Sequence, residues 1–222
     1  MGDLTADDGI FIRSMASRGS TGGLCRAARM AMDVMEAFGK DVVLVETVGV
    51  GQSEVDVLDA VDTSVVVLMP QIGDNIQVMK AGLMEIADVF VVNKSDLTGA
   101  EDFLADVDAL LDMNRSQGPG AWRPPAVKTC ASRGVGIEEV SAGLARHRAF
   151  LEEHGLMAEK RKKRLHKEIR ELFIEDLMHR VMDGFDADAR IAEAVERVVS
   201  RHSDPLAEMD SLINGILKPL AK

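Results

Sequence analysis

The amino-acid sequence is short of three features, and each shortage excludes a class of protein. No run approaches the ~20 consecutive apolar residues of a membrane-spanning helix, so we expect no membrane segment. The two cysteines, Cys25 and Cys130, form no C-x-x-C pair, which favours reduced core thiols over a disulfide framework, and we expect no function for either thiol. The 37 acidic residues outnumber the 26 lysines and arginines, and the net charge of -11 opposes binding to nucleic acid.

The rest of the composition is that of a globular protein. Its 222 residues, 46% apolar and 28% charged, suffice for one domain and an appendage. The first residues, MGDLTADDG, do not resemble a signal peptide, and with the reduced cysteines they predict a cytoplasmic location. The basic run 160–164 is interpreted as the solvated start of a helix rather than a patch for nucleic acid or an acidic partner. The five histidines show no metal-binding spacing, and we expect them at surface or helix positions.

Four apolar runs rich in β-branched residues recur in the first part of the chain. Segments with a helical pattern separate them, so strands and helices are predicted to alternate. This alternation indicates an α/β fold with a parallel sheet covered by helices on both faces. The predicted strands are residues 42–45, 64–69, 89–92 and 126–130.

The last third of the chain has no strand pattern. It predicts three helices, at about residues 157–182, 187–201 and 204–218. Their apolar stripes must be buried, either by an arm that packs on a second copy of the chain or by packing on the chain's own sheet domain. We therefore expect two domains, 1–150 with the sheet and 151–222 as a helical arm.

The most informative motif follows the third apolar run. Asn93-Lys94-Ser95-Asp96 is an N-K-x-D sequence, in which the Asp96 carboxylate can accept hydrogen bonds from both N1–H and the exocyclic amino group of guanine. Asn93 and the stem of Lys94 would hold the loop and cover the base. Open α/β sheets bind ligands beyond the carboxyl ends of their strands, which is where this motif stands. A surface turn is the alternative, but the context favours a site for GTP or GDP.

A second segment, ETVGVGQSE at residues 46–54, directly follows the first apolar run. Glu46 can reach Mg²⁺ or a water in its shell, and the amide of Gly49 can reach a γ-phosphate. Gln52 belongs to the same loop. Taken alone, the segment is equally well explained as a glycine-rich loop between a strand and a helix, but together with N-K-x-D the functional interpretation is favoured.

Two further segments carry weaker signals. Residues 129–136, TCASRGVG, end the last predicted strand, where an amide of Ala131 or Ser132 would meet the base oxygen. Between the other motifs, Asp74 and Lys80 have the spacing of a loop that responds to nucleotide. An N-capping Asp74 and a solvated Lys80 explain that spacing equally well.

The sequence has no G-x-x-x-x-G-K-[S/T] segment. P-loop nucleotide hydrolases use that segment to hold the β- and γ-phosphates and Mg²⁺. The nearest glycine-rich stretch is residues 19–24, GSTGGL, which lacks the Gly-Lys-Ser/Thr part.

Long stretches within residues 9–140 resemble the methylmalonyl-CoA mutase-associated GTPases of the MeaB/ArgK type. The resemblance implies a P-loop GTPase core that binds GTP or GDP with Mg²⁺, and a chaperone for a cobalamin-dependent acyl-CoA mutase. It also implies that the C-terminal helices form a homodimer. The matching stretches are residues 11–19, 22–24, 46–54, 65–88 and 93–96.

The same resemblance assigns roles to individual residues. It implies that Glu46 lies near Mg²⁺ and the γ-phosphate and that Asn93, Lys94 and Asp96 bind guanine. It places Asp74 and Lys80, with Gln52, in loops that couple the nucleotide state to the mutase.

In that family a helical extension, the P-loop strand and an Mg²⁺-binding aspartate precede the first matching stretch. Met1 stands shortly before that stretch, so we expect a fragment whose core is missing its P-loop strand and which needs the upstream segment to fold and to hydrolyse GTP. The rival expectation is a non-catalytic mutase-interaction or dimerisation fragment that binds nucleotide weakly or not at all.

Overall fold

A computed structural model describes residues 7–15, 26–47, 57–70, 86–113 and 120–220. The chain forms two compact units, Met1–Arg161 (the sheet unit) and Lys162–Lys222 (the helical unit). The division falls after Arg161 rather than after residue 150, and the interpretation of the two units as domains stays a prediction.

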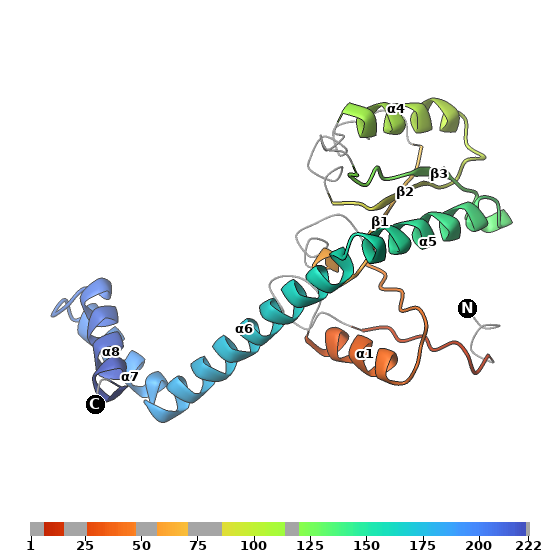
Figure 1. Ribbon diagram of the computed structural model, residues 1–222. Helices are drawn as coiled ribbons and strands as arrows, with labels where there is room; N and C mark the ends of the chain where they lie inside the picture. The colour runs from red at the N-terminus through yellow and green to blue at the C-terminus, as the bar shows by residue number, and fades with distance from the viewer. Residues whose placement is uncertain (1–6, 16–25, 48–56, 71–85, 114–119, 221–222) are drawn as a thin grey trace. The chain divides into compact units, whose positions relative to one another are not determined.

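The sheet unit is built on three parallel strands (Figure 1). They are β1 (Val65–Leu68), β2 (Val89–Val92) and β3 (Ala126–Lys128), in the order β1-β2-β3. All four side chains of β2 are buried, because this strand is central and both of its faces are covered. The predicted α/β fold with a parallel sheet is therefore confirmed.

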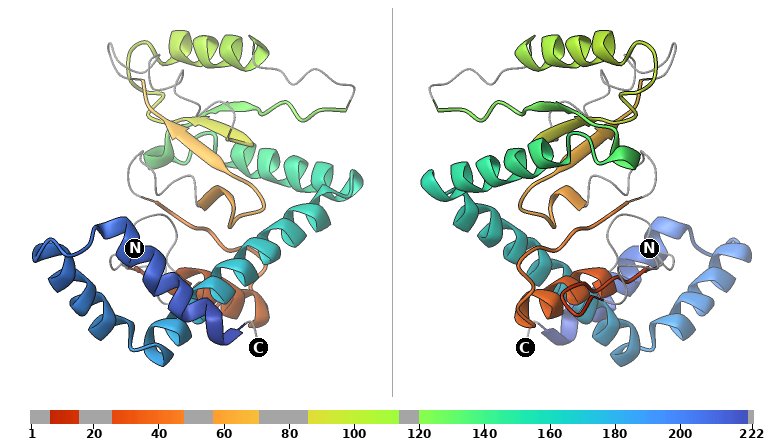
Figure 2. Two further views of the ribbon diagram at one scale, coloured as in Figure 1. Left: turned by 90° about the vertical axis from the view of Figure 1, so that its left-hand side faces the viewer. Right: turned by 90° about the vertical axis from the view of Figure 1, so that its right-hand side faces the viewer.

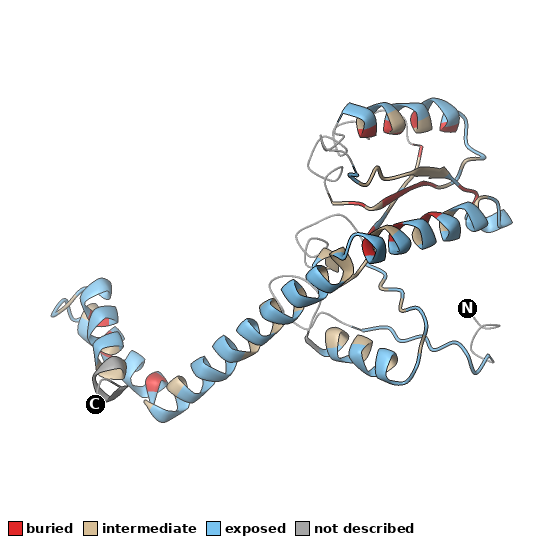
Figure 3. Ribbon diagram, viewed as in Figure 1, coloured by how far each residue is buried: buried red, intermediate tan, exposed pale blue. Residues whose placement is uncertain are grey.

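Two helices cover the sheet from opposite faces (Figure 2). On one face, α4 (Ala100–Met113) buries Phe103, Val107 and Leu111 against Phe90 and Val92. On the other face, α5 (Ile137–Glu153) brings Gly143 against Val89, whose Cγ1 would lie 3.8 Å from a Cβ at that glycine. Alternate residues of β2 thus pack on different helices, as the pleat of a strand requires. Figure 3 shows the buried residues on β2 and on the inner sides of both helices.

The first predicted strand does not form. Residues 42–47 follow helix α1 (Arg26–Ala37), and none of them belongs to a strand. The side chains of Val42 and Leu44 are 71% and 84% exposed. An apolar, β-branched run becomes a strand only where a neighbouring strand pairs with its backbone, and no strand in the described residues pairs with this segment. The expectation of a strand at 42–45 was therefore wrong in this structure.

A polar network closes the amino end of the sheet. His147 of α5 is only 2% exposed; its Nδ1 lies 2.8 Å from the Thr63 hydroxyl and its Nε2 lies 3.3 Å from Oδ1 of Asp88. The other carboxylate oxygen of Asp88 accepts hydrogen bonds from the Ser64 amide and hydroxyl at 2.8 and 2.9 Å. Lys160 places its ammonium group 3.7 Å from the same oxygen. The segments before β1 and β2 are thus joined to α5 through one histidine.

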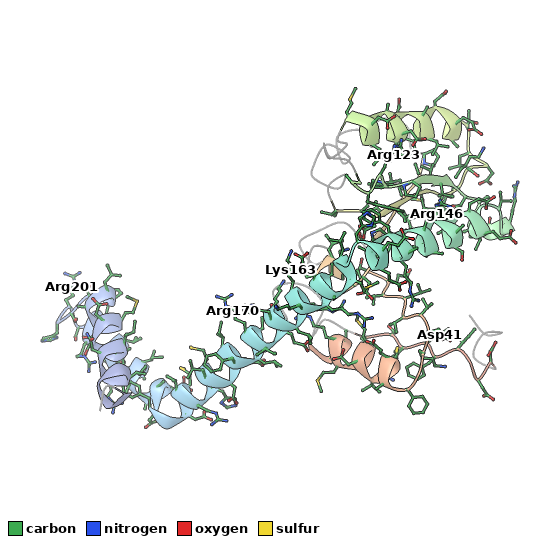
Figure 4. All side chains as sticks on the ribbon, in the orientation of Figure 1. Asp41, Arg123, Arg146, Lys163, Arg170 and Arg201 are labelled. Carbon is green, nitrogen blue, oxygen red and sulfur yellow. The ribbon has the colours of Figure 1, made fainter. Side chains whose placement is uncertain are left out.

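Arg123 links α4 to the segment that leads into β3 (Figure 4). Its guanidinium group donates to Asp112 at 2.9 Å and to Asp108 at 3.2 Å. These carboxylates raise the pKa of Arg123, with the hydrogen bond to Asp112 as the largest cause. The pairs are partly exposed, so their main effect is to fix geometry rather than to add much stability.

The helical unit confirms the three predicted C-terminal helices. They are α6 (Leu156–Gly184), which begins in the sheet unit, α7 (Ala187–Val199) and α8 (Pro205–Leu220). The carboxylate of Asp204 caps α8 by accepting the amides of Leu206 and Ala207, each at 3.0 Å. No helix in the described part of the chain is long and apolar enough to cross a membrane.

The helices α7 and α8 are joined by a bidentate ion pair. The Arg197 guanidinium group donates to the two carboxylate oxygens of Glu208 at 3.0 and 2.7 Å. This arrangement lowers the pKa of Glu208, chiefly through the hydrogen bonds from Arg197. Large apolar side chains nevertheless stay exposed on all three helices: Leu165, Ile169, Phe173, Ile174, Leu177, Met178, Ile191, Val195, Val199, Leu206, Met209 and Ile213.

Candidate nucleotide-binding site

The candidate site lies where two neighbouring strands end. The loop that follows β2 begins at Asn93, and the loop that follows β3 contains the short helix η3 (Ala131–Arg133). Since the strands are parallel neighbours, their carboxyl ends meet at one edge of the sheet. The backbone amide of Ser95 donates to the carbonyl of Thr129 at 2.9 Å, which ties the two loops together. Two segments that the sequence analysis selected separately are thus adjacent.

Asn93 braces this edge. Its side-chain Oδ1 accepts the Thr129 hydroxyl and the Ala131 backbone amide, both at 3.1 Å. One carbonyl oxygen therefore holds the end of β3 and the start of η3 at a fixed distance from β2. The Ala131 amide is already engaged by Asn93, and the assignment of a base contact to Ala131 or Ser132 stays a proposal.

Lys94 makes the turn from β2 toward Asp96. Its φ of 57° is in the left-handed region, which a residue with a side chain adopts rarely. The side chain is exposed, and its charge lies close enough to favour the ionised form of Asp96. An uncommon backbone conformation at this position is consistent with a constrained loop.

Asp96 has a partner for each of its carboxylate oxygens. The Cys130 thiol lies 3.4 Å from Oδ1, and the Arg133 guanidinium group lies 3.5 Å from Oδ2. The pKa of Asp96 is lowered, first by a hydrogen bond from its own backbone amide and then by the hydrogen bond from Cys130; Arg133 and Lys94 also lower it. The carboxylate is therefore ionised at neutral pH, and it keeps lone pairs for two further donors.

The loop that carries Cys130 is closed by glycines. Cys130 and Val135 exchange backbone hydrogen bonds of 3.0 and 3.2 Å. Gly134 and Gly136 take φ values of 68° and 80°, which glycine adopts at little cost. Gly136 also lies against the backbone of Lys128, so close that a Cβ there would be 2.1 Å from the carbonyl oxygen. The tight approach of these two segments sets the position of η3.

The structure brings together five residues that the sequence analysis selected, namely Asn93, Lys94, Asp96, Ala131 and Ser132. Glu46 is exposed in the unpaired segment after residue 42 and belongs to no cluster of three or more potential metal ligands among the described residues. Gly49, Gln52, Asp74 and Lys80 lie outside the described residues.

Two further residues at the site were not assigned to it from the sequence. Cys130 and Arg133 both contact Asp96, although the only sign of them was their place in the segment TCASRGVG. Which way a loop side chain points depends on the turn that η3 makes, and that turn has no periodic signal in the sequence. Cys130 is buried, as expected of a core thiol, and Cys25 lies outside the described residues.

Several named proteins are similar in sequence to this chain over most of its length. A putative GTPase of Pyrococcus abyssi is 41% identical over 96% of the chain and 66% of its own length. GTPase ArgK of Escherichia coli is 32% identical over 85% of the chain and 57% of its own length. The mouse protein named methylmalonic aciduria type A homolog, mitochondrial, is 38% identical over 62% of the chain and 34% of its own length. The chain thus spans about two thirds or less of the length of these relatives.

The fold is also similar to a solved one. The crystal structure of an LAO/AO transport system kinase matches with a TM-score of 0.69 and 28% identity, over 97% of this chain and 68% of the other. The sequence model of the family described as methylmalonyl Co-A mutase-associated GTPase MeaB matches residues 1–186. The resemblance inferred from the motifs is confirmed, and the chain belongs to the MeaB family of GTPases.

Proposed function

We propose that the loops after β2 and β3 bind the guanine base of GDP or GTP and that Asp96 recognises the base. The observation that carries this proposal is the ionised Asp96 carboxylate, held at the carboxyl edge of the sheet by two side chains of the neighbouring loop. Guanine presents N1–H and a 2-amino group side by side, which match the two oxygens of a carboxylate. Adenine presents an acceptor at N1, and two facing acceptors repel each other, so adenine nucleotides are disfavoured.

The other residues of the site have supporting roles in this proposal. Asn93 holds the two loops together, and the stem of Lys94 covers the face of the base. An amide of Ala131 or Ser132 meets the base oxygen. The bracing hydrogen bonds of Asn93 support the first of these assignments, because they fix the loops before any ligand arrives.

At the phosphate end we assign Glu46 to Mg²⁺ through a water and Gly49 to the γ-phosphate. Gln52, Asp74 and Lys80 would couple the nucleotide state to a partner. Mg²⁺ in nucleotide sites is held largely by the phosphates and by one or two carboxylates. The described residues alone do not gather a set of metal ligands.

We propose that the protein, when completed by a phosphate-binding segment, hydrolyses GTP. It would act as a chaperone of a cobalamin-dependent acyl-CoA mutase of the methylmalonyl-CoA mutase type. The family description and the name of the mouse relative support this role. Hydrolysis would need a G-x-x-x-x-G-K-[S/T] segment at the β- and γ-phosphates, and the printed sequence contains none. That observation favours a second candidate, a non-catalytic mutase-interaction or dimerisation role with weak or no nucleotide binding.

Replacing Asp96 with asparagine should change the preferred base. The new side chain has one accepting oxygen and one donating NH2 group, and the NH2 group would face a donor of guanine, so we expect the affinity for GDP to fall about tenfold to a hundredfold. Xanthine carries a carbonyl in place of the 2-amino group, and the new amide can donate to it, so the affinity for XDP should rise. Titration of the ¹⁵N-labelled chain with GDP, XDP and ADP, followed by NMR shifts, measures dissociation constants up to the millimolar range.

A second aspartate provides the control for this exchange. Asp106 lies exposed on α4, and its replacement by asparagine should leave the affinities for all three nucleotides unchanged. If the wild-type chain binds GDP no better than ADP, or if Asp96→Asn leaves the ratio of GDP to XDP affinity unchanged, the guanine site is disproved and the interaction role remains.

We also propose that the helical unit forms a homodimer. The side chains of Leu165, Ile169 and Phe173 recur every four residues along α6, and all three are exposed. An apolar face of this kind is stable in water only when it is covered.

Phe173→Glu should convert a dimer into a monomer, as measured by light scattering after gel filtration. Glu175→Lys lies on nearly the opposite side of the helix and should keep the dimer; a monomeric wild-type chain would refute the proposal.

A further inference from the structure

Two residues of the basic run near the start of α6 contact acidic and carbonyl groups of the sheet unit. Lys160 donates to the backbone carbonyl of Asp62 at 3.0 Å, and its ammonium group lies 3.7 Å from the Asp88 carboxylate. The guanidinium group of Arg161 lies 3.6 Å from Glu36 of α1 and 3.8 Å from the Asp62 carboxylate. The Arg161 side chain is 49% exposed, so its ion pairs contribute little stability. Lys160 therefore makes the stronger of the two links.

The turn between α5 and α6 is a place where α6 can pivot. α5 ends at Glu153 and α6 begins at Leu156, and Gly155 between them has a φ of 69°. A Cβ at Gly155 would meet nothing within 4 Å, so no packing fills the inside of this turn. Residues at the ends of helices commonly serve as hinges. Because Lys160 lies more than one helical turn beyond Gly155, its contacts limit such a pivot.

The partners of Lys160 are fixed in the sheet unit, whereas Lys160 itself can move. The Asp88 carboxylate accepts the Ser64 backbone amide at 2.8 Å, and the indole N–H of Trp122 donates to the Asp88 backbone carbonyl, also at 2.8 Å. The ring of His147 is buried. The Lys160 side chain is 41% exposed, so its ammonium group can turn into water without unfolding the helix.

The charge of His147 decides whether Asp88 needs Lys160 as a counter-ion. Among the described residues, the charged groups that face the ring are the Asp88 carboxylate, 3.3 Å from Nε2, and the Lys160 ammonium group beyond it. The uncharged groups around the ring belong to Thr63, Trp122 and Phe150. With a neutral ring, the charges of Asp88 and Lys160 balance. A protonated ring would itself neutralise Asp88 and would repel Lys160.

We propose that Asp88, His147 and Lys160 form a pH-sensitive switch, in which protonation of His147 releases Lys160 and lets the first turns of α6 pivot at Gly155. The sheet and α5 stay folded during this change, because Asp88 keeps its hydrogen bonds to Ser64 and Trp122. α6 continues into the helical unit, so the switch controls how freely the two units move. The inference does not depend on the proposed guanine site.

The first test uses the reciprocity of linked equilibria. If protonation of His147 weakens the contact of Lys160, removal of the Lys160 charge must favour protonation by the same free energy. Lys160→Met should therefore raise the pKa of His147, measured from the ring ¹⁵N shifts of the full chain. Lys162→Met removes the same charge from an exposed position two residues further along the helix, and it should leave this pKa unchanged. An unchanged pKa in Lys160→Met would overturn the switch.

The second test follows the movement itself by ¹⁵N relaxation and relaxation dispersion, which together cover fast and slow backbone motion. At pH 7.5 the amides of residues 156–161 should be as rigid as those of α5. Below the pKa of His147 we expect them to become mobile while α5 and β2 stay rigid. Lys160→Met should show this mobility already at pH 7.5, and Lys162→Met should behave like the wild type.

Two outcomes of the second test would overturn the proposal. In the first, residues 156–161 stay rigid after His147 has become protonated, or stay rigid in Lys160→Met at pH 7.5. In the second, α5 and β2 lose their rigidity at the same pH as the start of α6, which would show global unfolding in place of a local release.

Discussion

Replacing Gly136 with alanine is expected to destabilise the sheet unit by about 3 kcal/mol or more. Two costs add at this position. The φ of 80° is unfavourable for a residue with a side chain, and the new Cβ would lie 2.1 Å from the carbonyl oxygen of Lys128 and 3.0 Å from a methyl carbon of Thr129. The carbonyl belongs to the end of β3, so relief requires the strand and the loop to separate.

A substitution at Gly134, two residues earlier, distinguishes the backbone cost from the cost of the close contact. Its φ of 68° imposes a similar backbone penalty, but a Cβ there meets nothing within 4 Å. Gly134→Ala should therefore cost only about 1 kcal/mol. Urea unfolding followed by the fluorescence of the single tryptophan, Trp122, measures both variants. Equal losses of stability would show that the contact with Lys128 is relieved without cost.

The same substitution should reach the candidate site. Separation of the loop from β3 moves Cys130, which lies between Thr129 and η3, and with it the partner of Asp96. Gly136→Ala should thus weaken GDP binding more than Gly134→Ala does, even under conditions in which both chains stay folded.

The features that were predicted correctly from the sequence have local causes. The helical pattern of the C-terminal third predicted helices at about 157–182, 187–201 and 204–218, and the observed helices begin at Leu156, Ala187 and Pro205. Apolar periodicity and the Asp204-Pro205 cap are properties of neighbouring residues, so no knowledge of the tertiary structure is needed to interpret them. N-K-x-D was likewise placed correctly at a strand end, because the apolar run before it is as long as a strand.

The features that were missed depend on residues distant in the sequence. Residues 42–45 have the composition of a strand, but pairing is a property of two segments, and no described strand pairs with this one. The contact between Cys130 and Asp96 spans two loops and depends on the turn at Gly134 and Gly136. His147 was expected at a surface or helix position; it does lie on a helix, but it is buried among Thr63, Asp88 and the ring of Trp122, which come from three other segments.

The stability of the sheet unit should therefore depend on pH through His147. Burial lowers the pKa of this histidine, and the positive charge of Lys160 lowers it further, although Asp88 acts in the opposite direction. The neutral ring satisfies all its neighbours, since Nε2–H donates to Asp88 while Nδ1 accepts the Thr63 hydroxyl. Protonation would remove that acceptor and place a second positive charge near Lys160.

The sign of the effect follows from the number of bound protons. Below pH ~6.5 the histidine of the unfolded chain binds a proton, whereas His147 in the folded chain resists it. Between the lowered pKa and pH ~6.5, the unfolded state binds more protons, so the free energy of unfolding decreases as the pH falls through this window. Urea unfolding of the full chain at several pH values, followed by Trp122, reports this loss, because the Trp122 ring centroid lies 4.8 Å from that of His147.

Removal of the ring tests the network itself. His147→Leu leaves the buried side of Asp88 and the Thr63 hydroxyl without their shared partner, so we expect a loss of about 3 kcal/mol at pH 7.5. The variant should also lose the part of the pH dependence that His147 contributes, and its stability should approach that of the wild type as the pH falls. His154→Leu changes an exposed histidine next to the end of the same helix and should keep the wild-type pH dependence. If the free energies of unfolding of wild type and His147→Leu changed with pH in parallel, the prediction would be wrong. His147 would then titrate alike in the folded and unfolded chains, which its burial argues against.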